Sequence, residues 1–384
     1  MKKNARMLHR LLAMLLILFL IGCKTGQKNT DAKAKLADSS RQEDPAHEEP
    51  EQNTPEQDVH DQEEPAQESQ VIPWGKDEPI VQQAEDSGSM IICFMSGEGV
   101  KINSSSDTAF AEQKWGDSAL IAFPNGQTML IDGAMQDYAW LLVENLIALG
   151  ISKLDYVVVS HRHNDHIGGL TCMDGVLERF EIGQIYSSGI YNGNSSDPAA
   201  IEACARKRDI PCDTLAKGDT LMIGDVQVEV LWPLPGQEKT VSSSTEDCNN
   251  SSLVLRFDYG QTSALFTGDL YRAAEQQLIQ ELGDDIDKLD AGVLKIPHHG
   301  RQTSSSSDFI KAVSPQVGVA TGAIIMEPAI YASYAKEGTA VYMDVYDGYV
   351  KVMMNGSNVK VESSRVRNVD TYDKYDAAFG IQRD

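Results

Sequence analysis

Five of the eight histidines of this 384-residue chain fall in two short segments, each directly after an apolar run typical of a β-strand. His161, His163 and His166 lie in "SHRHNDHIGG", after "YVVVS", and His298 and His299 lie in "KIPHHG". Imidazole is a common ligand of zinc and of other divalent transition metals. The concentration of histidine at two strand ends therefore predicts a metal site.

The spacing of the first segment divides its residues between two cations. One residue separates His161 from His163, so both imidazoles can turn to one ion. Asp165 and His166 belong to the next turn and can face a second ion. Two ions about 3.5 to 4 Å apart need a bridging carboxylate and a bridging water. Asp269, at the end of "SALFTGD", is the candidate for that carboxylate.

His299 would complete the second site. Zinc suits this mixture of imidazole and carboxylate, although manganese or iron also fits. Such a centre performs metal-assisted hydrolysis, in which the cations lower the pKa of water and polarise an oxygen of the substrate. We expect Asp165 to steer the proton of the nucleophile as well as to bind metal.

The elements that must hold these residues alternate between two kinds. Runs rich in β-branched and other apolar residues predict strands at "SALIAF", "TMLID", "YVVVS", "DVQVEVLW", "SSLVLRF" and "SALFTGD". Helical patterns at "DYAWLLVENLIALG" and "YRAAEQQLIQELG" lie between some of them. Alternating strands and helices indicate an α/β layered domain, in which ligands usually bind at the ends of strands.

His161, His163, Asp165 and His166 together resemble the HxHxDH signature of the metallo-β-lactamase superfamily. The resemblance covers about residues 90–384 and implies an αββα sandwich with its metals at one sheet edge. Within the superfamily it points to ComEC-type competence proteins and to phosphorylcholine esterases of bacterial cell walls. The stretches "TMLIDGA", "NNSSLVLRFDYGQTSALFTGD", "LKIPHHGRQTSSS" and a C-terminal β-hairpin in "VYMDVYDGYVKVMMNG" suggest that branch.

The resemblance also implies roles for residues near the ligands. Asp132, at the end of "TMLID", is expected to orient a ligand histidine, whereas Asp117 is expected to be structural. His298 is expected to donate a hydrogen bond to a phosphoryl oxygen or a proton to the leaving group, with a packing role as the alternative. Arg301 either contacts an anionic substrate or is simply solvated, and "MEP" at 326–328 stands where relatives often have a histidine near the substrate.

One departure concerns the first metal. Many dinuclear members carry another histidine before the strand that leads to the bridging aspartate, yet this chain has none between His166 and His298. The segment there reads "EDCNNSS". Asn249 is the preferred substitute ligand; the other open alternatives are Asp247, Cys248, Asn250 and no protein ligand at all.

The N-terminus predicts export. Basic residues precede the apolar run "LLAMLLILFLIG", and the tetrapeptide that ends at Cys23 resembles a bacterial lipobox, with an uncleaved anchor as the alternative. We therefore expect a lipoprotein signal peptide at 1–23, lipidation of Cys23 and a lipid-anchored protein on the extracytoplasmic side of the cell membrane. Residues 24–89 are rich in Glu, Asp, Gln, Pro and Ser and predict a disordered acidic linker. The hydrolase domain is expected at 90–384.

Composition limits the partners. The net charge is −24, and the chain lacks the basic runs that proteins tracking long nucleic acid present to phosphate. Long nucleic acid is thus disfavoured as a substrate, and no protein partner is predicted. Five cysteines remain beside Cys23, an odd number; Cys204 and Cys212 are the close pair, and the alternative is that all five are small buried apolar residues.

Three functions follow in order of preference. The first is a metal-dependent phosphodiesterase or phosphoesterase acting on a small-molecule or polymer phosphodiester, either DNA or wall polymer. The second is an amide or ester hydrolase of β-lactams or lactones, disfavoured because Asp269 stands where well-known zinc β-lactamases use cysteine. The third is a non-enzymatic binding lipoprotein with a degraded metal site.

Overall fold

A computed structural model describes residues 72–97, 115–171, 173–193, 200–367 and 369–382. The predicted signal peptide, Cys23 and most of the predicted linker lie outside these residues. Within them, no helix is both long and apolar enough to span a membrane.

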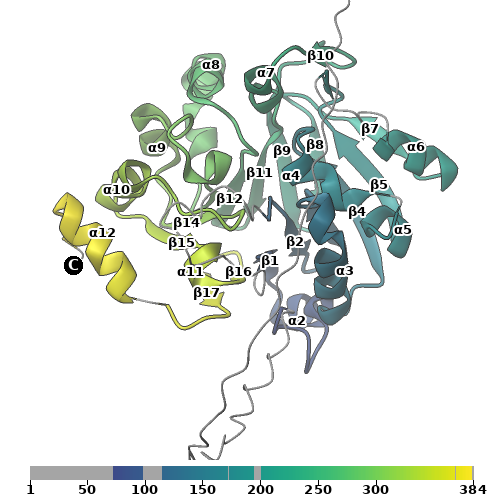
Figure 1. Ribbon diagram of the computed structural model, residues 1–384, viewed down its shortest axis with the longest axis horizontal. Helices are drawn as coiled ribbons and strands as arrows, with labels where there is room; N and C mark the ends of the chain where they lie inside the picture. The colour runs from purple at the N-terminus through teal and green to yellow at the C-terminus, as the bar shows by residue number, and fades with distance from the viewer. Residues whose placement is uncertain (1–71, 98–114, 172, 194–199, 368, 383–384) are drawn as a thin grey trace, which may run out of the picture. The chain divides into compact units, whose positions relative to one another are not determined.

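Two large β-sheets face each other in the part of the chain that the structure describes (Figure 1). The first, in spatial order, contains β17 (Val359–Ser363), β16 (Val350–Met354), β1 (Met90–Phe94), β2 (Ala119–Ala122), β3 (Thr128–Ile131), β4 (Lys153–Val159), β5 (Glu181–Ser187) and β7 (Cys212–Thr214). The second contains β15 (Ala340–Met343), β14 (Val317–Ala320), β13 (Val293–Lys295), β12 (Thr262–Phe266), β11 (Val254–Tyr259), β9 (Val226–Trp232) and β8 (Thr220–Ile223). A short parallel pair joins β6 (Tyr191–Asn192) to β10 (Val241–Ser242).

The side-chain alternation of the strands explains the layering. Met90, Ile92 and Phe94 of β1 point into the core between the sheets, whereas Ile91 and Cys93 point to the outer face. Both faces of the strand are buried, which is why its sequence is apolar throughout and does not alternate with polar residues.

Helices cover both outer faces (Figure 1). The outer face of the first sheet packs against α2 (Ile80–Ser87), α3 (Ala139–Ala148), α5 (Val176–Arg179) and α6 (Ala200–Lys207). The outer face of the second sheet packs against α8 (Arg272–Leu282), α9 (Ser307–Val313), α10 (Pro328–Lys336) and α12 (Val369–Phe379). The short helices α4 (Asn164–Ile167), α7 (Thr245–Asn250) and α11 (Asp344–Asp347) lie in loops. The expected αββα sandwich is confirmed.

A C-terminal hairpin is present, but it joins β16 to β17, which pair antiparallel; the first residues of the stretch "VYMDVYDGYVKVMMNG" instead form β15 in the second sheet. The folded part begins before the predicted boundary at residue 90. The side chain of Ile80 on α2 is fully buried in the outer core of the first sheet, and the backbone N–H of Ile72 donates to Asn145 Oδ1 at 2.9 Å. Residues 72–89, assigned to the linker from their composition, therefore pack onto the domain because they carry a few well-spaced apolar side chains.

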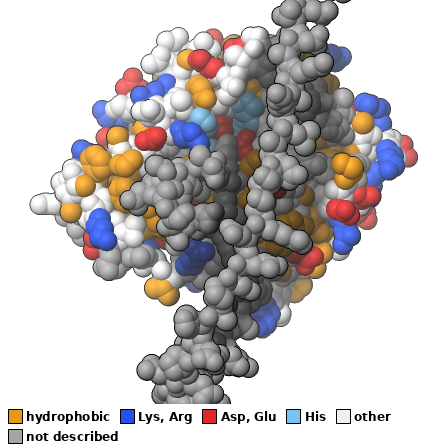
Figure 2. All heavy atoms as spheres, in the orientation of Figure 1, with side chains coloured by type: hydrophobic (Ala, Val, Ile, Leu, Met, Phe, Trp, Pro, Cys, Tyr) orange, Lys and Arg blue, Asp and Glu red, His pale blue; other side chains and the backbone are white. Residues whose placement is uncertain are grey.

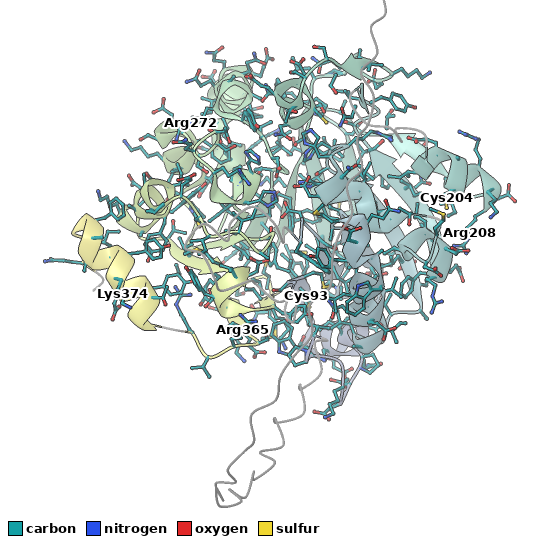
Figure 3. The ribbon with its side chains drawn as sticks, viewed as in Figure 1. Cys93, Cys204, Arg208, Arg272, Arg365 and Lys374 are labelled. Atoms are coloured by element: carbon teal, nitrogen blue, oxygen red, sulfur yellow. The ribbon has the colours of Figure 1, made fainter. Side chains whose placement is uncertain are left out.

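The cysteines do not form the close pair that the sequence left open. Cys204, which lies on α6 (Figure 3), is disulfide-bonded, whereas Cys212 is free. Cys93 and Cys248 are free and buried, as expected for small apolar residues.

Candidate metal centre

The predicted site residues follow strands that end at one edge of the sandwich. Asp132 follows β3 and the first histidine segment follows β4, two parallel neighbours in the first sheet. Asp269 follows β12 and His299 follows β13, which are parallel neighbours in the second sheet. Because parallel strands end at the same edge, the two sheets bring these four positions together.

His166 is held from its Nδ1 side. Asp132 Oδ2 lies 2.8 Å from His166 Nδ1, and the carboxylate is fixed by the backbone N–H of Ser160, 2.8 Å from Oδ1, and by its hydroxyl, 2.6 Å from Oδ2. All three residues are buried. The structure thus places Asp132 where it can orient His166, with Nε2 directed away from it.

His299 is held in the same way by different groups. Its Nδ1 lies 3.0 Å from the carbonyl oxygen of Thr321 and 3.2 Å from Asp117 Oδ1. The hydroxyl of Thr321 donates to the same carboxylate oxygen. Asp117 is therefore more than the structural residue expected from the sequence, because it contacts a predicted ligand. Its position in "GD" just before the strand "SALIAF" was the available signal.

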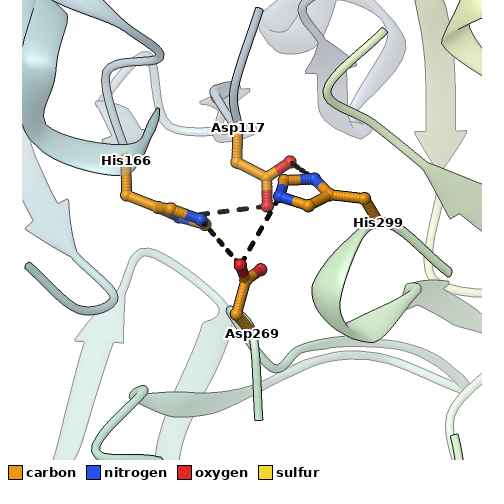
Figure 4. A group of neighbouring side chains, drawn as sticks. All are labelled: Asp117, His166, Asp269 and His299. Carbon is orange, nitrogen blue, oxygen red and sulfur yellow. Dashed lines mark ion pairs between the residues drawn. The ribbon is translucent and has the colours of Figure 1, made fainter. Parts of the chain in front are cut away.

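The Nε2 atoms of both histidines converge on one oxygen (Figure 4). Asp269 Oδ2 lies 3.2 Å from His166 Nε2 and 3.4 Å from His299 Nε2, while Asp165 Oδ2 lies 3.3 Å from His299 Nε2. One ligand atom from each of Asp117, His166, Asp269 and His299 fits within 4.8 Å of the others. Both Nε2 atoms are buried and make no hydrogen bond. Buried polar atoms of this kind need a partner, and a divalent cation is one that imidazole and carboxylate share.

His161 and His163 form the second group of donors. His161 Nε2 lies 3.0 Å from His163 Nδ1, and the two rings are nearly perpendicular. The ring of His161 also lies 4.0 Å, between centroids, from that of His166. The two imidazoles lie within hydrogen-bond distance of each other, and ligation of a second cation by this pair stays a prediction.

The charges of the site suit a divalent cation. Burial alone would raise the pKa of Asp269, but His166, His299 and Lys295 hold it well below its usual value. Burial, together with neighbouring His166, lowers the pKa of His161 well below 6.5 and keeps this imidazole neutral. Burial opposes the charge of His166 as well, yet Asp269 and Asp132 raise its pKa to about 10. The neighbouring carboxylates thus favour a proton on His166, and a metal ion that binds this imidazole must compete with that proton.

The rim of the site holds His298. Its side chain is 12% exposed; Nδ1 lies 2.5 Å from Thr303 Oγ1, and Nε2 lies 3.8 Å from Asp269 Oδ2. The ring of Tyr271 lies 4.9 Å from the imidazole, between centroids. Tyr271 was not singled out from the sequence, although it follows Asp269 by two residues. His298 and His299 both adopt left-handed backbone conformations, with φ of 49° and 56°. Such strain is common where a functional site dictates side-chain direction.

Arg301 is exposed on the same loop and lines a cavity of about 380 Å³. The other lining residues include Met326, Glu327 and Pro328, the "MEP" segment that departs from the family pattern. The backbone N–H of Glu327 donates to the carbonyl of Gly300 at 3.0 Å, which holds this segment beside the histidine loop. On the face shown in Figure 2, histidine and acidic side chains reach the surface next to one another.

Asn249, the preferred extra ligand, lies buried on α7, and its Oδ1 makes no hydrogen bond. Burial raises the pKa of the Tyr271 phenol, and the Asn249 side chain beside it lowers that pKa in part. Asp247 is exposed and bound to Ser243, so it is a poor alternative. Cys248 is a buried thiol whose pKa burial raises, which disfavours the thiolate form. Ligation by Asn249 stays a prediction, and no contact favours Asn250 over it.

Comparison with known proteins agrees with this geometry. The family model of the metallo-beta-lactamase superfamily matches residues 116–320, more than half of the chain. ComE operon protein 3 of Bacillus subtilis is 27% identical over 221 residues, which cover 53% of this chain and 26% of that protein. Competence protein ComA of Neisseria gonorrhoeae is 31% identical over 206 residues, which cover 54% of this chain and 25% of that protein.

The chain thus spans about a quarter of the length of these two relatives. Among solved structures, the metallo-beta-lactamase fold protein YhfI from Bacillus subtilis superposes with a TM-score of 0.40 at 13% identity, covering 66% of this chain and 96% of that one.

Proposed function

The chain belongs to the metallo-β-lactamase superfamily, whose fold implies a metal-dependent hydrolase, and from this premise we propose that it is a phosphodiesterase or phosphoesterase. The observation that supports a hydrolytic centre most directly is the convergence of His166 Nε2 and His299 Nε2 on Asp269 Oδ2, at 3.2 and 3.4 Å. Asp269 would be shared between two cations, with His161 and His163 on one side and Asp165, His166 and His299 on the other.

Zinc is the proposed metal, because the donors are imidazole nitrogens and carboxylate oxygens; iron and manganese accept the same donors. When bound, the two ions supply Lewis acidity at the substrate oxygen and lower the pKa of water toward neutrality. The chain's own residues must then bind the substrate, orient it and move protons.

His298 is the residue best placed for that work. It lies at the partly exposed rim of the site. Its Nδ1 is hydrogen-bonded to Thr303 Oγ1, and its Nε2 faces Asp269 Oδ2. From there it can donate a hydrogen bond to a phosphoryl oxygen or a proton to a leaving group. The exposed Arg301 on the same loop adds a cation that would attract an anionic substrate.

A phosphodiester suits this site better than a β-lactam. Its anionic, tetrahedral centre matches a rim that offers an imidazole, a phenol and a guanidinium, and the shared ligand is a carboxylate and not a cysteine thiolate. The likeness to competence proteins suggests DNA as a substrate, whereas the net charge of −24 favours small or wall-polymer phosphodiesters over long duplexes. We also propose that Cys23 carries a lipid that anchors the protein outside the cytoplasmic membrane.

A substrate panel tests the activity. The full chain, purified in detergent and loaded with zinc or manganese, would be assayed on bis(p-nitrophenyl) phosphate, p-nitrophenyl phosphorylcholine, single-stranded DNA and nitrocefin. We expect turnover of one or more of the phosphodiesters and none of nitrocefin, with all turnover lost in Asp269→Asn. Hydrolysis of nitrocefin alone would refute the phosphodiesterase.

A further inference from the structure

Lys295 places a charged side chain in the core between the two sheets. It ends β13, on the same face as Val293, which packs in that core, while Leu294 points to the outer face. Its side chain is only 5% exposed. Burying an ammonium group costs several kcal/mol unless it is paired. An apolar residue would be the ordinary choice at this position, so the lysine requires a specific reason.

The ammonium lies directly beneath the metal centre. Nζ forms an ion pair with Asp117 Oδ2, lies 3.4 Å from Asp269 Oδ1 and donates to the carbonyl of Gly268 at 3.0 Å. Gly268 immediately precedes Asp269 and has a left-handed φ of 50°. The lysine thus holds both the carboxylate and the backbone turn that presents it.

The contacts of Asp269 are divided between its two oxygens. Oδ1 faces Lys295, whereas Oδ2 faces His166, His298 and His299. The contacts of Asp117 are divided between its oxygens in the same way. Oδ2 forms an ion pair with Lys295, and Oδ1 faces Nδ1 of His299. One ammonium therefore reaches two predicted ligands, Asp269 directly and His299 through Asp117.

We propose that Lys295 is a positioning residue of the metal centre, which turns Asp269 Oδ2 toward both cations and keeps Asp117 out of the coordination sphere. Without the ammonium, Asp269 can rotate or offer both oxygens to one ion, and Asp117 Oδ2 becomes an available ligand. The proposal rests on the metal-dependent site proposed above, and it predicts a change in metal coordination rather than a general loss of structure.

The test compares Lys295→Met with Lys351→Met. Lys351 is a matched control because it is 6% exposed, is paired with Glu362 at 2.8 Å and lies on β16 of the other sheet, with its ammonium 5.1 Å from the Trp74 ring centroid. Both full-length variants would be loaded with cobalt(II), and three properties measured: bound cobalt, its visible absorption spectrum and its affinity by competition with a chelator. These measurements need no substrate.

We expect Lys295→Met to show an altered cobalt spectrum and an affinity for one of the two ions weakened by about 10- to 100-fold, the usual effect of removing a group that holds a metal ligand. Lys351→Met should match the wild-type protein in both. A wild-type spectrum and wild-type affinities in folded Lys295→Met would overturn the proposal, as would an equal change in Lys351→Met.

If the methionine variant does not fold, Lys295→Gln takes its place, because glutamine keeps similar bulk and an N–H donor while removing the charge. An altered cobalt spectrum with weakened affinity supports the proposal, and a wild-type spectrum with wild-type affinities overturns it. The wild-type protein could bind cobalt and still hydrolyse no phosphodiester. That result would refute the proposed substrate class, and the cobalt spectra and affinities would still decide the role of Lys295.

Discussion

Two adjacent histidines, His298 and His299, have opposite surroundings in the structure. His299 is fully buried, with Nε2 between the carboxylates of Asp165 and Asp269, whereas His298 is partly exposed and its Nε2 lies 3.8 Å from Asp269 Oδ2. Their rings are 5.8 Å apart and inclined by 49°. Consecutive side chains thus point to different parts of one site, in a loop where both residues have left-handed backbone conformations.

Single substitutions separate the two roles. His299→Ala should lower metal content as well as activity, because it removes a buried donor from the centre. His298→Ala should keep its metal and lose turnover by about 10² to 10⁴, the range for removal of a general acid or base. Elemental analysis and kinetics on the same preparations check both. Metal loss in His298→Ala with metal retention in His299→Ala would reverse the assignment.

Asp344 provides a prediction about pH. The carboxylate of this buried residue accepts hydrogen bonds from the backbone N–H groups of Gly322 at 3.0 Å and Ala323 at 2.9 Å, in the segment that follows Thr321. Burial, aided by Asp117, raises its pKa from 3.8 to about 7. The folded protein therefore keeps this proton longer than the unfolded chain, so the associated stability is present below about pH 4 and is lost as the pH rises toward 7.

Asp344→Asn should remove this dependence. Urea unfolding of both metal-free proteins, with chelator present, would be compared between pH 4 and 7. The free energy of unfolding of the wild-type protein should fall relative to that of the variant by a few kcal/mol over this range, the size set by about 1.4 kcal/mol per pKa unit. Parallel curves would show that the pKa of Asp344 is not raised.

Among the elements, the ends of β3, β4, β12 and β13 determine the site, and α2 extends the domain toward the N-terminus. Ile80 and Ala84 of α2 are fully buried, and the backbone N–H of Ile80 donates to the carbonyl of Leu149 at 2.9 Å. The helix therefore contributes to the outer core of the first sheet.

Ile80→Ala should lower the free energy of unfolding by about 2 to 5 kcal/mol, the range for such truncations in a core. Gln82→Ala, at an exposed position on the same helix, should change it by no more than about 0.5 kcal/mol. Chemical denaturation of both variants checks this. Equal effects would mean that α2 does not pack as the structure shows.

The sequence predicted the strands and the two histidine segments because these depend on local patterns, whereas the sandwich was implied by the resemblance to the metallo-β-lactamase superfamily. It did not reveal the contact of Asp117 with His299 or the burial of Lys295. A lysine in the strand "VLKIP" is indistinguishable from an ordinary solvent-facing residue until the facing sheet is in place. Likewise, α2 was hidden within an acidic tract because its few apolar residues matter only through the core that they join.

At the scale of the whole molecule, the N-terminal sequence predicts that the domain is anchored to a membrane. Cys23 lies outside the described residues, so lipidation remains a prediction from the tetrapeptide that it ends. A Cys23→Ser protein should leave the membrane fraction, and mass spectrometry of the wild-type N-terminus should show a diacylglycerol on the cysteine. Equal membrane retention of the serine variant would refute the lipid anchor.

The central claim concerns metal, and metal content tests it most directly. The full chain should bind close to two divalent cations, and the ion near Asp165, His166 and His299 should be held more tightly than the ion near His161 and His163, which lacks a third histidine. Elemental analysis during stepwise chelation would show two losses, one at low and one at high chelator concentration. Metal-free protein that cannot be reloaded with zinc or manganese would contradict the account.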